Sequence, residues 1–320
     1  MIIKSNDFEE SLFEFDMRSL YIEQELISET LKERYKIIQG INESEDGIAN
    51  KISQIISKIF DSISDLLEKA IMNLRKTFQG LNFKKAKDKI EQIRKSTNDP
   101  KEVEFDLLIP KVKLLKAPLV DELNPEIIVG LRINGNQWEM DEKHRGMIPD
   151  KRTSNVKIGC KAYGQSLAIN AIGCNHRNYQ IDDFMKDDSL FKKCIQETEK
   201  ISINKQNCQN QKGLIEQQLE TVEKFMGHDF NKCIDKLSKL KTDSRKIAIK
   251  SKTMNFMNTD PLSVSGALGR PDKNLKNIFI NAANCYQSTI RYTVQYLFQS
   301  TAFHIQCLNK NVSNFSNALL

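Results

Sequence analysis

The chain has 320 residues, of which 39% are hydrophobic and 28% are charged, and its mean hydropathy is −0.49. This composition is sufficient for a globular core and excludes wholesale disorder. No run approaches the roughly 18 consecutive apolar residues of an ordinary transmembrane helix.

The net charge of +6 conceals two regions of opposite sign. Residues 1–46 carry twelve acidic and five basic side chains, a net charge of −7, so the rest of the chain carries +13. Such regions can attract each other, and the basic one can meet nucleic acid or anionic lipid, although solvated helix faces explain the same charges more simply. The early acids interrupt any signal-peptide core, which indicates synthesis in the cytoplasm.

Helical patterns dominate the first 98 residues. Asp7 is a suitable N-cap, and the apolar spacing predicts a helix over 8–38. The most regular pattern in the chain predicts a second helix over 48–78, stopped by Gly80, and a basic helix follows over 82–95. We name as the isoleucine stripe the apolar positions Ile52, Ile56, Ile59, Ile63, Leu66 and Leu67. The stripe predicts burial in a helix bundle or, alternatively, insertion into a membrane interface.

The middle of the chain has a different character. Five of the seven prolines lie between residues 100 and 149, which excludes long helices there. Alternation over 103–109 and the apolar run 127–133 predict strands, and Asn134-Gly135 predicts a hairpin turn with a return strand over 137–140.

Helical patterns resume after this region, with candidate helices over 159–172, 181–202 and 207–241 and a loop over 254–272. A final helix is predicted over 273–309, where residues 277–309 contain only one formal charge, that of Arg291. A helix so poor in charge suits a central or intersubunit position.

The sequence therefore predicts a mainly α fold: an elongated bundle of long amphipathic helices with a small insertion that contains a β-hairpin. We expect an N-terminal helical region over 1–98, a proline-rich β-containing insertion over 99–158 and a C-terminal helical region over 159–320.

Signatures of chemistry are scarce. The sequence has no phosphate-loop, dinucleotide-binding, zinc-hydrolase or serine-hydrolase motif. The close Cys/His pairs, Cys174 with His176 and His304 with Cys307, have no further ligands at metal-site spacing, and the seven scattered cysteines predict reduced thiols. We expect a protein that is not an enzyme and that uses no cofactor, no metal and no small-molecule substrate. An active site without a recognisable motif, for example around Cys174 and His176, is the remaining enzymatic alternative.

Two lysine clusters are candidate contacts for nucleic acid or an acidic partner. The first comprises Lys84, Lys85, Lys87 and Lys89, and the second comprises Lys239, Lys241, Arg245, Lys246, Lys250 and Lys252. Lysine neutralises phosphates without reading bases, so any such binding would be non-specific and sensitive to salt.

Three segments carry a resemblance: SLFEFDMRSLYIEQELISETLKERYKI, KISQIISKIFDSISDLLEKAIMNLRKTF and NCYQSTIRYTVQYLFQSTAFHIQCLNK. Together with the lysine-rich segment between them, they resemble the helical internal-virion or structural proteins of tailed bacteriophages of low-GC Gram-positive bacteria. The resemblance covers about half of the chain, and it implies location in the virion after synthesis in the bacterial host cytoplasm.

The expected function is that of a non-enzymatic virion protein that assembles through its helices, with itself or with other virion proteins, and contacts DNA through the lysine clusters. The alternative is a membrane-active helical protein, either an ejection protein or an α-helical pore-former, that inserts the helix over 48–78 into a membrane surface.

Overall fold

A computed structural model of the chain describes residues 48–98, 100–101, 104–115, 131–134, 137–140, 188–252 and 273–320. This part of the chain is mostly helical and contains two antiparallel sheets of two strands each. The mainly α class with a small β component is thereby confirmed. The predicted helices over 8–38 and 159–172 lie outside the described residues.

The second predicted helix is present with the predicted bounds. Helix α2 spans Ile48–Phe78, and its last turn is closed by a hydrogen bond from the Gln79 N–H to the Arg75 carbonyl at 2.8 Å. Gly80 follows with φ of +91°, a conformation that L side chains rarely adopt. The glycine therefore ends the helix, as the sequence indicates. Helix α3 (Lys84–Lys95) comes next, close to the predicted range of 82–95.

The C-terminal helices are longer than predicted. Helix α9 (Gly213–Lys224), a π-turn (Phe225–Asp229) and helix α10 (Phe230–Lys252) form one continuous helical run, where the sequence predicts a helix over 207–241. The last helix, α12, spans Lys273–Leu319 and so extends beyond the predicted end at residue 309.

The two sheets have different origins. Strands β2 (Leu131–Asn134) and β3 (Gln137–Met140) form the predicted hairpin, in which Asn134 pairs with Gln137. Strand β1 (Phe105–Pro110) pairs instead with the distant strand β4 (Thr198–Ile203). The predicted helix over 181–202 is therefore wrong in its second half, because helix α8 (Asp188–Ile195) ends before β4 begins. Pairing with β1 satisfies the backbone hydrogen-bonding groups of β4. The sequence around β4 does not indicate this pairing, because β1 is distant in the chain.

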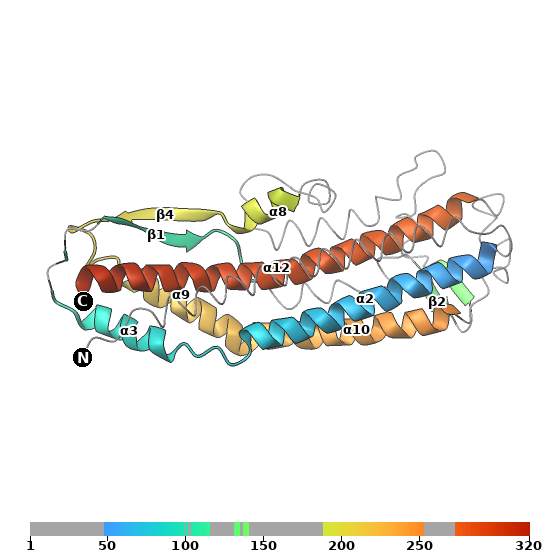
Figure 1. The fold of residues 1–320 in the computed structure, drawn as a ribbon, viewed down its shortest axis with the longest axis horizontal. Coiled ribbons are helices and arrows are strands. Elements are labelled where there is room, and N and C mark those ends of the chain that lie inside the picture. The colour runs from blue at the N-terminus through green and yellow to red at the C-terminus, as the bar shows by residue number, and fades with distance from the viewer. Residues whose placement is uncertain are drawn as a thin grey trace.

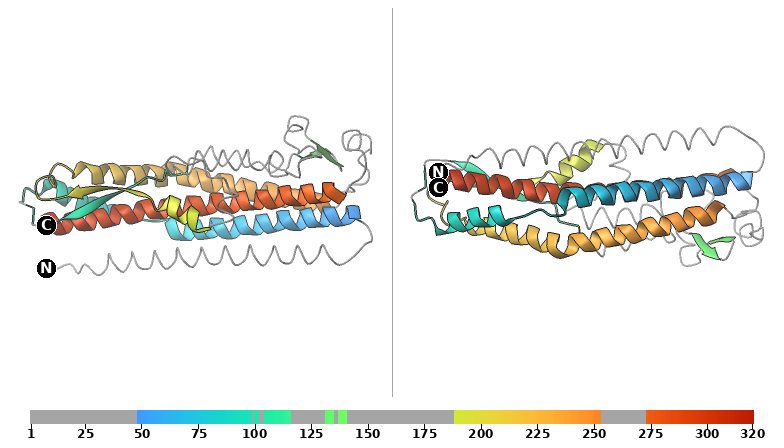
Figure 2. Two further views of the ribbon diagram at one scale, coloured as in Figure 1. Left: turned by 90° about the horizontal axis from the view of Figure 1, so that it is seen from above. Right: turned by 60° about the horizontal axis from the view of Figure 1, so that its bottom comes forward.

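Helix α12 is the central element of the described fold. It contacts α2, α3, α8, α9 and β1 along its length. Figures 1 and 2 show α2 and α10 beside its N-terminal half and α9 and α3 beside its C-terminal half. The nine residues 290–298 are all buried, so this part of α12 is covered on every side. The central position predicted for the last helix is confirmed.

An extended segment, residues 105–115, runs alongside α12 in the antiparallel direction, and we call it the strap. The side chains that hold it are spaced along α12. The Tyr296 hydroxyl donates a hydrogen bond to the Lys113 carbonyl, and His304 Nε2 donates to the Val112 carbonyl at 2.8 Å. A carbonyl can only accept, so His304 carries its proton on Nε2.

Asn311 makes the most complete of these contacts and is fully buried. Its amide accepts a hydrogen bond from the Leu108 N–H at 2.9 Å and donates to the Leu108 carbonyl at 2.8 Å. Gln218 of α9 closes the network, because its Nε2 donates to the same carbonyl at 2.8 Å while its Oε1 accepts from Asn311 at 2.9 Å. Three elements, β1, α9 and α12, thus meet at one satisfied polar cluster.

We predict that Asn311→Ala lowers the free energy of unfolding by about 2–4 kcal/mol, because both backbone groups of Leu108 lose a buried partner. Asn317→Ala is the matched control, since Asn317 is exposed on the same helix. Urea unfolding followed by circular dichroism measures both variants. Equal stability of the two would show that the network does not support the fold.

We also predict acid sensitivity at the strap. Burial holds the pKa of His304 below its ordinary value of 6.5, although the hydrogen bond to Val112 partly opposes this shift. As the pH falls below about 6.5, the unfolded chain therefore takes up this proton first and the folded state loses stability. Between pH 7.5 and pH 5.5, the native protein should lose more unfolding free energy than His304→Gln, which lacks the titrating group. Parallel losses in the two proteins would contradict the assignment.

Candidate functional site: the charged seam between α2 and α10

Helices α2 and α10 pack against each other in antiparallel directions. The Ser57 hydroxyl donates to the Ala248 carbonyl at 2.8 Å near one end, and Glu68 pairs with Lys241 at 3.8 Å further along. We call the outward surface along this contact line the seam. It is the candidate functional surface because one of the two predicted lysine clusters lies on it.

The inner faces of both helices are apolar. Seven of the buried residues of α10 follow a heptad spacing: Phe230, Cys233, Leu237, Leu240, Ser244, Ile247 and Ser251. Ile234 and Ala248 are buried beside them. In α2 the stripe residues Ile59, Ile63, Leu66 and Leu67 all lie in the core. The backbones of Ile52 and Ile56 belong to α2, but their side chains lie outside the described part of the structure. The described part of the isoleucine stripe is therefore covered by the chain itself.

Three acids of α2, Asp61, Asp65 and Glu68, line one side of the seam, and we call them the acidic row. Their spacing of four and then three residues places them on one helix face. The pKa of Asp65 is raised by partial burial and by the neighbouring charges of Asp61 and Glu68, while Lys69 and Arg245 of α10 oppose that rise. The three carboxylates of the acidic row therefore lie close enough to influence one another's ionisation.

The predicted lysine cluster of α10 lines the other side, and we call it the basic row: Lys239, Lys241, Arg245, Lys246, Lys250 and Lys252. Lys252 pairs with Asp61 at 3.1 Å and Lys241 pairs with Glu68, and Arg245 lies near Asp65, so these three members of the row face the acidic row. Lys246 pairs with Asp243 of its own helix at 3.4 Å. The seam therefore carries both positive and negative charges and is not a purely cationic patch.

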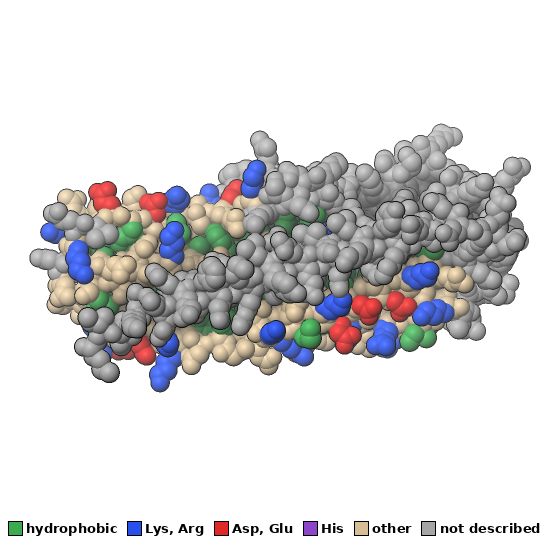
Figure 3. All heavy atoms as spheres, viewed as in Figure 1, with side chains coloured by type: hydrophobic (Ala, Val, Ile, Leu, Met, Phe, Trp, Pro, Cys, Tyr) green, Lys and Arg blue, Asp and Glu red, His purple; other side chains and the backbone are tan. Residues whose placement is uncertain are grey.

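Two large apolar side chains interrupt these charges. Met72 of α2 is 61% exposed, and Ile249 of α10 is 57% exposed. Figure 3 shows the same alternation over α2 and α10, where positive and negative side chains lie beside each other with isolated hydrophobic ones among them.

The first lysine cluster lies on α3 and also has acidic partners. Lys87 pairs with Glu223 of α9 at 2.8 Å, and Arg94 of the same helix lies 3.8 Å from Glu216. Lys84 and Lys85 are exposed, and Lys89 is partly buried.

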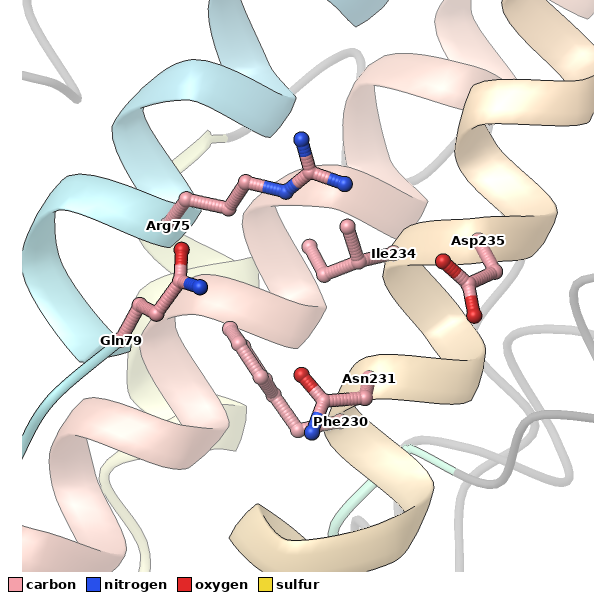
Figure 4. A pocket seen from close by; sticks show the side chains of 6 residues that line it. All are labelled: Arg75, Gln79, Phe230, Asn231, Ile234 and Asp235. Atoms are coloured by element: carbon pink, nitrogen blue, oxygen red, sulfur yellow. The ribbon is translucent and has the colours of Figure 1, made fainter.

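A small pocket opens where α2 ends and α10 begins (Figure 4). Arg75 of α2 and Gln79, which follows the helix, face Asn231 and Asp235 of α10, and the apolar residues Phe230 and Ile234 lie between them. Its volume of about 150 Å³ is below the roughly 300 Å³ at which ligand pockets usually begin. We therefore assign it no ligand.

The cysteines and histidines of the described residues have structural positions. Cys194, Cys208, Cys233 and Cys307 are buried free thiols, in agreement with the expectation of reduced cysteines. Burial raises the pKa of Cys307 to about 12, so this thiol stays protonated, and the neighbouring His304 is engaged by the strap. No group of three or more His, Cys, Asp and Glu side chains in the described ranges could hold a metal ion. Cys174 and His176 lie outside those ranges.

Comparison with protein-family models, with curated proteins and with solved structures finds no match to this chain. The resemblance to helical phage virion proteins is thus carried by sequence pattern and composition. Among the described helices, none is both long and apolar enough to cross a membrane.

Sequence reasoning identified the basic row but missed the acidic row opposite it. The signal was available, because Asp61, Asp65 and Glu68 repeat at helical spacing as Lys241 and Arg245 do. What the sequence could not supply was the antiparallel contact that brings the two rows together. The strap anchors Tyr296, His304 and Asn311 were also missed, although they recur at intervals of eight and seven residues.

We predict that the seam charges contribute little to folding. The double variant Lys241→Ala/Lys252→Ala should change the free energy of unfolding by less than about 1 kcal/mol, because both ion pairs are solvated. Leu67→Ala, which truncates a fully buried residue beneath them, should cost about 2–5 kcal/mol. Chemical denaturation of the two variants measures both effects. A double variant as unstable as Leu67→Ala would make the seam a structural element of the monomer.

Proposed function

We propose that this protein is a non-enzymatic structural protein that acts through helix-mediated assembly, and that its full chain forms an elongated helical bundle with a small β insertion. The supporting observation is the seam. Its two rows of opposite charge and its exposed Met72 and Ile249 form a surface suited to another helical surface. The core beneath it is already filled by the chain's own apolar residues.

We further propose that the protein belongs to a bacteriophage particle, as an internal or structural protein that contacts other virion proteins. This step rests on the resemblance of its long helices to those of helical virion proteins. Peptide mass spectrometry of purified particles, from the phage whose genome encodes the chain, tests it. Particles that lack its peptides would refute the location.

Contact with DNA is a narrower part of the proposal. Lys84, Lys85 and Lys239 are exposed and can reach phosphates, but Lys87, Lys241, Lys246 and Lys252 already pair with acids. A duplex would compete with those carboxylates, so we expect weak binding that falls steeply with salt.

The alternative, a membrane-active protein that inserts α2, has a definite structural cost. Ile59, Ile63 and Leu67 would have to leave the core and separate from α10 and α12. Insertion would therefore require the described fold to open, and it should be slow or conditional.

Size-exclusion chromatography with light scattering tests the proposal on the full chain. The protein is run alone, with vesicles of anionic phospholipid, and with a short DNA duplex. We expect a defined multimer whose mass is unchanged by vesicles. Self-association is the direct consequence of a helix-mediated structural role.

A monomer that moves into the vesicle fraction would overturn this proposal in favour of the membrane-active alternative. Co-elution of the multimer with duplex at low salt would support the DNA contact. If the multimer elutes separately from the duplex at low salt, the proposed DNA contact is refuted, and the assembly proposal is unaffected.

A further inference from the structure

We infer that two copies of the chain pair through the seam, about a two-fold axis that runs parallel to α2 and α10. This inference rests on the proposed assembly function and deepens it, because it names the surface, the partner and the register. The partner is a second copy of the same chain.

The choice of surface follows from what is buried. The described members of the isoleucine stripe are in the core and cannot meet a second copy without unfolding. Among the described residues, four large hydrophobic side chains are exposed, and two of them, Met72 and Ile249, lie on α2 and α10. The seam thus combines apolar contact points with charges that a partner can satisfy.

The choice of a second copy follows from the register of the charges. Because α2 and α10 are antiparallel, Glu68 lies level with Lys241 and Asp65 lies near Arg245. A two-fold axis parallel to the helices places α2 of each copy over α10 of the other at the same level. The acidic row of each copy then faces the basic row of its partner, in a closed, isologous contact.

The same pattern excludes the other face-to-face arrangement. A two-fold axis in the interface but perpendicular to the helices would lay α2 over α2 and α10 over α10. Each acidic row would then oppose an acidic row, and each basic row a basic one, which is unfavourable. The charges therefore select the orientation, while Met72 and Ile249 contribute apolar burial.

Charge reversal on the full chain tests the inference. The first variant is Asp61→Lys/Asp65→Lys/Glu68→Lys, which makes the seam wholly basic. The second is Lys241→Glu/Arg245→Glu/Lys252→Glu, which reverses the three basic residues that face the acidic row. The matched control, Glu216→Lys/Glu220→Lys/Glu223→Lys, applies the same change in charge to α9, away from the seam. Circular dichroism first confirms that each variant is folded.

Sedimentation equilibrium in low salt is the measurement. We expect the native protein and the α9 control to dimerise, and each seam variant alone to associate at least about tenfold more weakly. An equimolar mixture of the two seam variants should form a heterodimer, because each row again faces its opposite. Met72→Ser/Ile249→Ser, which alters only exposed side chains, should also weaken the native dimer.

Two results would overturn the inference, and they differ in what they say about function. If the native protein forms a multimer that both seam variants retain, the seam is not the interface, but helix-mediated assembly stands. If the native protein is a monomer at every accessible concentration, both the seam dimer and self-assembly fail as its function. Failure of the mixed variants to associate, when each alone is folded and monomeric, would refute the two-fold register.

Discussion

The described fold depends on satisfying the backbone of a strand that has only one neighbouring strand. β1 pairs with β4 on one edge, and on its other edge the N–H and carbonyl of Leu108 are met by the side-chain amide of Asn311. A buried peptide group without a partner is costly, so this amide takes the place of a third strand. The same network joins α9 and α12 to the strap.

Helix α12 can act as this central support because its polar residues are mostly uncharged. Residues 273–320 contain no acid, and the buried polar side chains on α12 include Gln287, Thr293, Gln295, Ser300 and Thr301. Neutral groups can be satisfied within the helix or by a neighbour, as Ser300 is by the Tyr296 carbonyl at 2.6 Å. Apart from the buried Arg291, the charges described above lie at the outer edges of the helix pairs, where water lowers the cost of their ionisation.

The sequence was most informative where structure is local. The apolar spacing of α2, its stop at Gly80 and the β2–β3 hairpin depend on nearby residues and were predicted with close bounds. The sequence predicts helix where β4 lies, because the strand is stabilised by a partner that is distant in the sequence. The same holds for the candidate surface. The basic row is a continuous stretch of the sequence and can be predicted, whereas its pairing with the acidic row depends on how two distant helices pack.

The distance between the strap and its anchor has a consequence for biosynthesis. Leu108 precedes Asn311 by 203 residues, so a ribosome adding about 5–20 residues per second makes the anchor about 10–40 s after the strand. During that interval the Leu108 N–H and carbonyl lack the hydrogen-bond partner that Asn311 later provides. The described core can close only after translation of the last helix, and until then the edge is open to pairing with another chain.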